Sequence, residues 1–407
     1  MKIILNLLLL IGLLVFLVSR FFTGSSFDNQ LDSIVKPYVF SLVGWELGVI
    51  PQEIRLSLSN QPGKIDDEIG LVTEYFQSTE QIKALQARID ATRAGQGKYE
   101  LSTLEIELSK MQARQAASES TAEMILERQI RETLTEQGIF NPLARLKINF
   151  PPVNFKLAKP PHILIISPRD RIESTRQITL ESDLSLDEME NIEAAVDKLG
   201  VSSLVVEIGG IATYPTFVTN DMTLRATIDT AVEEWVHQYL TFKPLGFLYL
   251  LDLTHLRQNY EIATMNETLS GMVSKEIGRL IYQKYYAPRE EAGSGTETPT
   301  HESEFDFNRE MREIRQQVDL YLAQEEIKRA EQFMETKRQY LASQGYYLRK
   351  LNQAYFAFHG TYADSPTSID PIGRELKELR GQSASLKDFL NRVAAMTSRQ
   401  ALKTSLE

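Results

Sequence analysis

A proline-rich segment, residues 141–161, is the strongest constraint that the sequence places on the fold. It contains five prolines, including the pairs Pro151-Pro152 and Pro160-Pro161. Proline fixes φ, lacks a backbone N–H and disfavours a helical conformation of the residue before it, so a regular helix cannot run through this segment. The sequence therefore predicts an extended linker here, with a domain boundary between two differently patterned parts of the chain.

The part before the linker has the apolar spacing of helices. Apolar residues recur every three or four positions over residues 64–137, and Gly95 and Gly97 interrupt the pattern. This spacing with a glycine break predicts two long helices that fold back on each other. We therefore expect an antiparallel helical hairpin or coiled coil at residues 64–140. It is charge-rich, has no residue pattern with chemistry of its own, and would serve as an arm that spaces the body from a membrane.

The first 22 residues predict a membrane anchor. An apolar run extends from Ile3 to Val18, and Phe21 and Phe22 can prolong it into the interface of a bilayer. A cleaved signal peptide is the alternative, but no Ala-x-Ala type of cleavage site follows the run. We expect an uncleaved single-pass anchor at residues 1–22 and a juxtamembrane segment at residues 23–63. The bulk of the chain would then lie outside the cytoplasm.

The part after the linker alternates between strand and helix patterns. A helix that begins with a capping box of Ser185 and Glu188 is predicted at residues 185–199. Runs rich in β-branched residues predict strands at residues 162–167, 176–180 and 203–208. These elements predict an α+β core with a small mixed sheet over residues 162–287.

Two further segments follow this predicted core. Residues 288–303 are polar and rich in Gly, Thr and Glu, which predicts a flexible insertion. Residues 304–407 begin with a helical apolar period that predicts one long helix, returning alongside the hairpin, and end with a shorter amphipathic helix. We expect this last segment to complete the core.

A short motif in the predicted core has the spacing of a metal site. On a helix, Glu233 and His237 lie four positions apart on one face, and Glu234 is beside them. The zinc-protease signature H-E-x-x-H uses this spacing to place two metal ligands and a general base, although Glu stands here at the first position. Further along, Asn266-Glu267 opens a second predicted helix, whose small residues would let Glu267 approach the same metal.

The composition limits the kinds of site and partner. The 407 residues include no cysteine and five histidines, so a metal must be held by His, Asp or Glu side chains. Disulfides, thiolate zinc sites and cysteine nucleophiles are excluded. A net charge of −11 provides no basic face that would neutralise phosphates, so no nucleic-acid partner is expected.

Taken together, these residues resemble the gluzincin metallopeptidases, in particular the predicted aminopeptidase-like zinc proteins of bacterial envelopes. The resemblance covers residues 204–364 and implies a zincin-like catalytic core. Three features carry it: Glu233-Glu234-x-x-His237 in place of H-E-x-x-H, Asn266-Glu267 as the downstream N-E, and Asn352-x-Ala354 followed by a tyrosine-containing turn.

Position by position, the resemblance implies that His237 and Glu267 are zinc ligands and that Glu233 stands where the family has its first histidine ligand. It makes Glu234 the base that activates the metal-bound water, and Tyr362 a hydrogen-bond donor to a developing oxyanion. A second carboxylate neutralises more of the zinc charge than an imidazole does, so water at the metal would be acidified less.

The implied function is that of a membrane-anchored zinc metallopeptidase that hydrolyses a peptide or protein substrate. Two alternatives remain compatible with the same residues. One is a catalytically impaired pseudo-metallopeptidase that acts as an envelope binding or scaffold protein. The other is a scaffold in which Glu233 and His237 form only a structural ion pair.

Overall fold

The structure is a computed structural model that describes most of the chain after the predicted anchor. The anchor and the predicted flexible insertion lie outside the described residues. Within the described part, no helix has both the length and the apolar character that crossing a bilayer requires. The described residues are 26–40, 67–94, 100–143, 149–254, 256–287 and 305–407.

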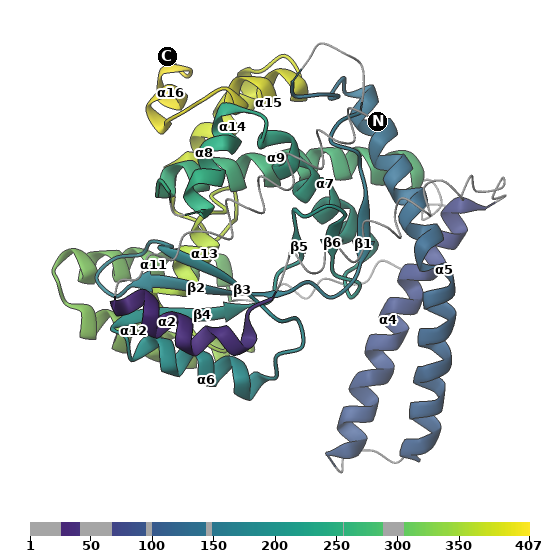
Figure 1. Ribbon diagram of the computed structural model, residues 1–407, viewed down its shortest axis with the longest axis horizontal. Coiled ribbons are helices and arrows are strands. Elements are labelled where there is room, and N and C mark those ends of the chain that lie inside the picture. Colours follow the sequence, from purple (N-terminus) through teal and green to yellow (C-terminus); the bar gives the residue numbers. More distant parts are fainter. Residues whose placement is uncertain (1–25, 41–66, 95–99, 144–148, 255, 288–304) are drawn as a thin grey trace.

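The described chain has an α+β fold, as the sequence predicts, and its first sheet is antiparallel in the order β3-β2-β4 (Figure 1). One face of this sheet is covered by α2 (Ser26–Val35) and α6 (Leu186–Asp197), and the other by α13 (Gln353–Gly360). Burial on both faces explains why the central strand is a continuous apolar run. The strands are β2 (His162–Pro168), β3 (Arg176–Leu180) and β4 (Val201–Val206).

Two features at the edge of this sheet follow from local sequence. The predicted capping box is present, because Ser185 and Glu188 exchange side-chain and backbone hydrogen bonds at the start of α6. The short helix η1 (Lys36–Tyr38) follows α2 and leads into a bridge between Val39 and Leu180. Part of the predicted juxtamembrane segment is therefore built into the sheet layer.

The second sheet is mixed, in the order β1-β6-β5. Its strand β6 (Thr216–Val218) pairs in parallel with β1 (Phe155–Leu157) and antiparallel with β5 (Gly210–Ile211). The prediction of a linker is wrong for the second half of residues 141–161, because β1 lies within it. Alternate side chains of this stretch, including those of Phe155 and Leu157, are buried in the main core.

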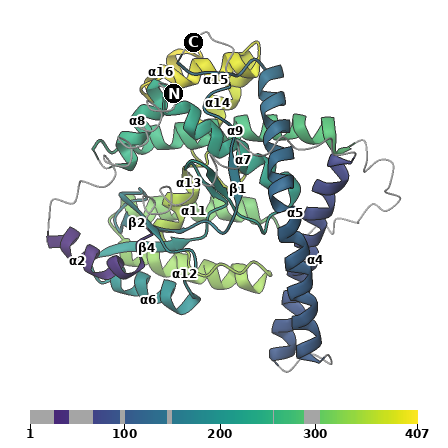
Figure 2. The same ribbon diagram turned by 45° about the vertical axis from the view of Figure 1, so that its right-hand side comes forward.

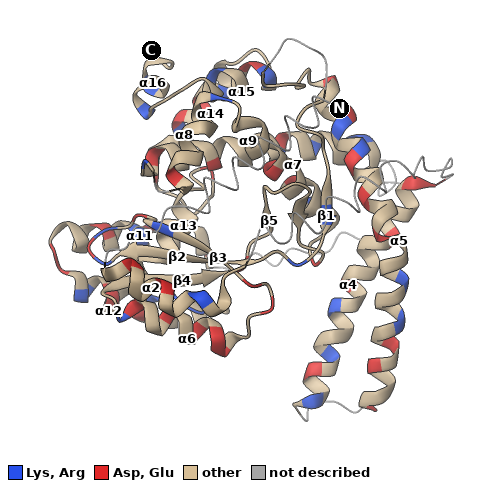
Figure 3. Ribbon diagram, in the orientation of Figure 1, with Lys and Arg blue, Asp and Glu red and all other residues tan. Residues whose placement is uncertain are grey.

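The predicted hairpin is formed by α4 (Glu68–Arg93) and α5 (Leu101–Glu136), which pack along each other and project from the body (Figures 1 and 2). Both acidic and basic residues lie along the projecting part (Figure 3). The base of the hairpin contributes Tyr75 and Leu126 to the main core. Its far half is joined by a small separate cluster that includes Leu85.

The main core is centred on α7 (Leu224–Leu240) and α9 (Tyr260–Tyr285), which pack against each other. The second helix begins earlier than predicted, because the side chain of Asn259 accepts a hydrogen bond from the N–H of Ile262 and caps it there. Asn266 and Glu267 therefore lie inside the helix. Other helices that pack in this region are α8 (Pro244–Leu253), α14 (Pro371–Gln382), α15 (Leu386–Ala394) and α16 (Arg399–Thr404).

The long helix predicted after residue 304 is two helices in the structure. These are α11 (Phe307–Ala323) and α12 (Ile327–Ser343), and Glu325 between them has a φ of 59°. A residue in the left-handed region interrupts the helical hydrogen bonds, so the chain reverses and the two apolar faces pack on each other. They form a cluster with residues of α13 and lie away from the α4–α5 hairpin (Figure 1).

Candidate metal centre

The crossing of α7 and α9 brings the three predicted metal ligands together. One ligand atom each from Glu233, His237 and Glu267 lies within 4.8 Å of the other two. The Nε2 atom of His237 is 3.5 Å from a carboxylate oxygen of Glu267. Ligands about 2.1 Å from a tetrahedral zinc ion are about 3.4 Å apart, so small side-chain movements would complete the geometry.

Small residues on α9 allow this close crossing. A Cβ atom on Gly278 would overlap the carboxylate of Asp229, so only a glycine fits there, whereas a Cβ atom on Gly271 would meet Oε1 of Glu233 at an ordinary contact distance of 3.9 Å. The hydroxyl of Ser270 is 3.4 Å from Nδ1 of His237. We expected small residues near Glu267 to permit this approach, and the packing agrees with that expectation. Gly278, two turns beyond Gly271 on α9, continues the stretch in which the two helices lie close together.

Asn266 sets the orientation of the histidine. Its Oδ1 is 2.7 Å from Nδ1 of His237, and an amide oxygen requires a proton on that nitrogen. Nε2 is then the ring nitrogen that faces Glu267, and it would become a donor to a cation once its own proton is lost. Metal-binding histidines commonly have such a partner on the second nitrogen. The sequence indicated the N-E pair, but not this role of the asparagine.

Glu267 is held by two tyrosines. The hydroxyl of Tyr249, on α8, donates a hydrogen bond to its Oε1, and Tyr362 bonds to the same carboxylate. Burial acts to raise the pKa of Glu267, but His237 and the two hydroxyls outweigh it and lower that pKa. Burial raises the pKa of Tyr249 and of Tyr362 well above 10, so both remain donors.

The sequence-based role of Tyr362 as an oxyanion donor is not tested by this arrangement, in which its hydroxyl contacts Glu267. Tyr249 was not predicted at all. The sequence places it in a helix with no recognisable motif, and only the packing of α8 on α9 brings it to the site.

Glu234 faces the end strand of the second sheet. A Cβ atom on Gly210 would lie 2.9 Å from Oε1 of Glu234, so only a glycine lets β5 pass this close. The paired glycines at 209 and 210 thus permit the close backbone approach that the sequence indicates. Burial raises the pKa of Glu234 to about 8, with a further contribution from Glu233. A carboxylate with a pKa near neutrality is suited to accept a proton.

The site has more acidic than basic side chains. Burial raises the pKa of Glu233 to about 7, and the carboxylates of Glu267 and Asp364 add to this while His237 and Lys275 oppose it. Burial acts to lower the pKa of His237, but the surrounding carboxylates raise it to about 10. Lys275 is paired with one oxygen of Asp364. The other oxygen, Oδ1, is buried without a hydrogen-bond partner.

A cavity of about 200 Å³ lies elsewhere, beside α11 and α13, and none of the three candidate ligands lines it. The basic group in it, Arg315, is bound to Asp319 through two contacts of 3.0 Å. His359 also lines this cavity. It belongs to no cluster of candidate metal ligands among the described residues. The chemistry is therefore concentrated at the α7–α9 crossing.

Comparison with known proteins gives no further assignment. No protein-family model, curated protein or solved structure matches this chain. What can be inferred about function therefore depends on the geometry and electrostatics of the α7–α9 crossing.

Proposed function

We propose that this protein is a metal-dependent hydrolase of peptide bonds, with a zincin-like arrangement in which Glu233, His237 and Glu267 hold one divalent cation. The observation that carries the proposal is the convergence of their ligand atoms within 4.8 Å, from two separate helices. An unbalanced group of buried carboxylates is costly unless a cation is bound, which supports the same conclusion.

The donor set fits zinc. Imidazole and carboxylate groups are both zinc ligands, and three protein ligands leave a position open for catalysis. The lowered pKa of Glu267 keeps its carboxylate ionised. His237, whose pKa is raised to about 10, would release its Nε2 proton when a cation binds, while Asn266 keeps the proton on Nδ1. A bound zinc ion would polarise the scissile carbonyl and make water a better nucleophile.

The side chains around the ligands fit peptide hydrolysis. Glu234 follows Glu233 on α7, interacts electrostatically with His237 and Glu267, and has the raised pKa of a group that takes a proton from the attacking water. Among the described residues, strand β5 pairs with β6 on one side only, and its Gly210 passes directly beside Glu234. An extended peptide added to the open side of β5 would run past this carboxylate, because sheet edges bind peptides through main-chain hydrogen bonds.

A second candidate is a pseudo-metallopeptidase that binds without hydrolysis. The observation that favours it is the direct ion pair between His237 and Glu267, at 3.5 Å, which satisfies both groups without a metal. Glu at position 233 would also lower the acidity of water at the metal. In this case the fold would present β5 or the hairpin to a partner.

The test combines a metal count with an activity measurement. The full chain is purified without chelator, its metal content is determined, and hydrolysis of a mixed peptide library is followed by mass spectrometry. We expect about one zinc per chain and a loss of about 10²- to 10⁴-fold in hydrolysis for Glu234→Gln, since the base is removed. Metal without hydrolysis would favour the pseudo-metallopeptidase, and the absence of both metal and hydrolysis would exclude the hydrolase.

The control variant is Glu190→Gln, which changes an exposed glutamate of α6 that takes part in no described contact at the site. It should retain the metal content and the hydrolysis rate of the unmodified chain. Thermal unfolding of both variants should match the unmodified protein, which separates a chemical effect from misfolding.

A further inference from the structure

Helix α8 has an unusual surface. Its sequence, PLGFLYLLDL, is apolar around nearly the whole circumference. Leu245 is buried, whereas Phe247 is 54% exposed, Leu253 is 38% exposed and Leu256, just after the helix, is 47% exposed. These are three of the ten large hydrophobic side chains that are exposed in the described chain. They all fall within one short stretch.

Such a surface calls for a covering partner. A helix that is apolar on all sides is normally buried, and contiguous exposed apolar patches mark protein or membrane contacts. On its inner side, α8 packs against α7, α9 and α15. Its outer side is left open by the part of the chain that the structure describes.

We propose that α8 lies in the interface of a lipid bilayer and docks the body of the protein on the membrane. The first argument is its dimensions. Ten residues of helix are about 15 Å long, too short to cross a bilayer but suitable for lying in its surface. Lys243 precedes the helix and Arg257 follows it. Arg257 is exposed and can contact lipid head groups.

The second argument is the tether that the sequence provides. The apolar run Ile3 to Val18 ends shortly before α2, which begins at Ser26. The intervening stretch can extend by at most about 25 Å, so an inserted apolar run would keep α2 within that distance of the bilayer. At this range the effective concentration of lipid is high, and a modest apolar patch is sufficient for binding.

The third argument is the arrangement of the helices. Figures 1 and 2 place α2 and α8 on one side of the molecule and the α4–α5 hairpin on the opposite side. A bilayer that holds the tether therefore lies on the side of α8, and the hairpin lies on the far side of the molecule (Figures 1 and 2). The inner side of α8 carries Tyr249, which bonds to Glu267, so the docked face adjoins the candidate metal centre. The docking itself does not depend on a bound metal.

Site-specific fluorescence quenching tests this proposal directly. The chain has no cysteine, so a single cysteine can be introduced and labelled with an environment-sensitive dye. The full chain carrying Phe247→Cys is reconstituted into vesicles of phosphatidylethanolamine and phosphatidylglycerol, with or without nitroxide-labelled acyl chains. We expect about half of the fluorescence to be lost to the nitroxide lipid, as for a side chain at the acyl boundary.

Two matched controls have nearly the same side-chain exposure. Leu186→Cys, at the start of α6, and Ile106→Cys, on the hairpin, change residues that are 52% and 56% exposed. Both should show little quenching, and α6 is a stringent choice because it packs against α2 near the tether. Equal quenching at all three positions would overturn the proposal, because contact would then be non-specific.

A second variant distinguishes lipid from a protein partner. With the dye at Leu253→Cys, adding Phe247→Glu should abolish the quenching, because a carboxylate is costly at the acyl boundary. Phe247 is exposed, so this change should not affect folding, which circular dichroism would check. A dye that is shielded from aqueous iodide but not quenched by nitroxide lipid would overturn the proposal and indicate that a second copy or another protein covers α8.

Discussion

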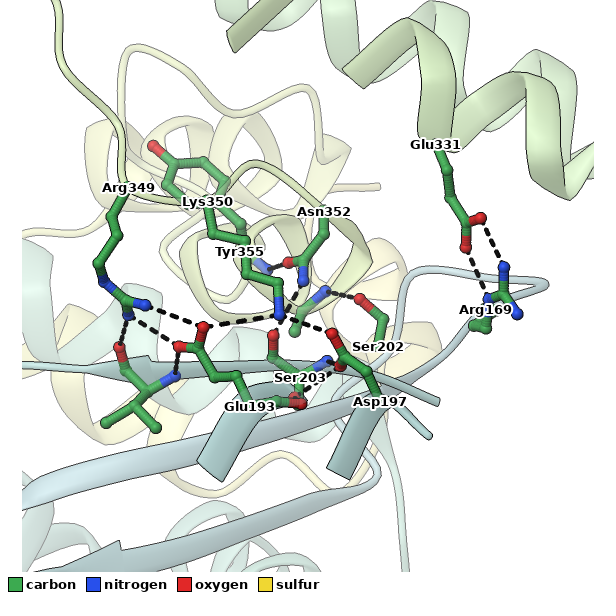
Figure 4. A network of polar contacts seen from close by, with 12 residues as sticks. Arg169, Glu193, Asp197, Ser202, Ser203, Glu331, Arg349, Lys350, Asn352 and Tyr355 are labelled. Atoms are coloured by element: carbon green, nitrogen blue, oxygen red, sulfur yellow. Dashed lines mark hydrogen bonds and ion pairs between the residues drawn. The ribbon is translucent and has the colours of Figure 1, made fainter. Parts of the chain in front are cut away.

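Two buried acidic groups of this protein differ in their counter-charges. On α6, the carboxylate of Glu193 is only 4% exposed. It receives two hydrogen bonds of 2.8 Å from Arg349, with Lys350 at 3.6 Å and the N–H of Val205 at 2.7 Å (Figure 4). Each lone-pair direction of the carboxylate thus has a partner, and its charge is fully neutralised.

The neighbouring contacts explain what this first group does. Asp197 receives hydrogen bonds from Lys350 at 2.8 Å and from the hydroxyl of Ser203 at 2.7 Å, and Asn352 donates to the carbonyl of Ser203 (Figure 4). The network fastens α6, β4 and the segment that leads into α13 to one another. Its charges are balanced, so we interpret it as structural.

The group at the α7–α9 crossing is unbalanced. Glu233, Glu234 and Glu267 meet there, and the cationic groups that act on Glu233 are His237 and Lys275, the second of which is paired with Asp364. Burial raises the pKa values of Glu233 and Glu234 toward neutrality, and the neighbouring carboxylates add to this effect. The comparison teaches that buried charge in this protein is neutralised by arginine and lysine where it is structural. At the α7–α9 crossing arginine and lysine do not supply this balance, and the proposed cation would supply it.

The largest expected effect comes from the structural group. Glu193→Gln should lower the free energy of unfolding by about 3 kcal/mol, because it leaves the guanidinium of Arg349 without its carboxylate in a poorly hydrated place. Urea denaturation would measure this loss. The equivalent change Glu233→Gln, made in metal-free protein, should not lower the free energy of unfolding. A similar destabilisation by both changes would contradict the distinction between a structural group at Glu193 and an unbalanced group at Glu233.

The next effect is the stabilisation by metal. Zinc at a hundred times its dissociation constant should raise the free energy of unfolding by about 2.7 kcal/mol, if it binds only the folded state. Thermal unfolding with chelator and with added zinc would measure the shift. Glu267→Gln should remove it and Glu193→Gln should retain it. Stabilisation that persists in Glu267→Gln would place the metal elsewhere.

Replacing one carboxylate of the unbalanced group tests whether that residue contacts the metal. Glu233→His should strengthen zinc binding by about tenfold, or about 1.4 kcal/mol, because imidazole is the preferred donor at catalytic zinc sites. Competition with a fluorescent zinc chelator would measure the affinity. Unchanged or weaker binding would mean that the side chain at position 233 does not contact the metal.

The last expected effect, stated per pH unit, is a dependence of stability on pH. The pKa values of Glu233 and Glu234 are raised to about 7 and about 8 in the folded protein, so their protonated forms favour folding. This contribution is complete below pH 4.5 and is lost as the pH rises through 7 to 8. Metal-free protein should therefore lose stability between pH 5 and 8, by less than about 1.4 kcal/mol per pH unit for each group.

The same titration with zinc present should give the opposite sign. The metal binds the deprotonated carboxylates, so protons compete with it at low pH and stability should increase as the pH rises. Denaturation at a series of pH values, with and without zinc, would measure both slopes. Identical slopes in the two series would argue against Glu233 as a ligand.

Local sequence patterns predicted much of the secondary structure. The strand at residues 176–180 and the capped start of α6 agree with the prediction, and the hairpin helices lie where the apolar period places them. Errors arose where distant contacts decided the outcome. The second half of the proline-rich segment became buried strand β1, held in part by the indole N–H of Trp235 on the carbonyl of Pro151.

In the candidate site, too, some features follow from local sequence and others from tertiary packing. The sequence by itself determined that Glu233 and His237 lie on one helical face, because a helix places residues four apart side by side whatever surrounds it. Only the tertiary structure decided that Glu267 meets them, that Asn266 orients His237, and that Tyr249 holds Glu267. These contacts depend on how closely α7, α8 and α9 pack, and packing distance is a property of the assembled core that no single segment encodes.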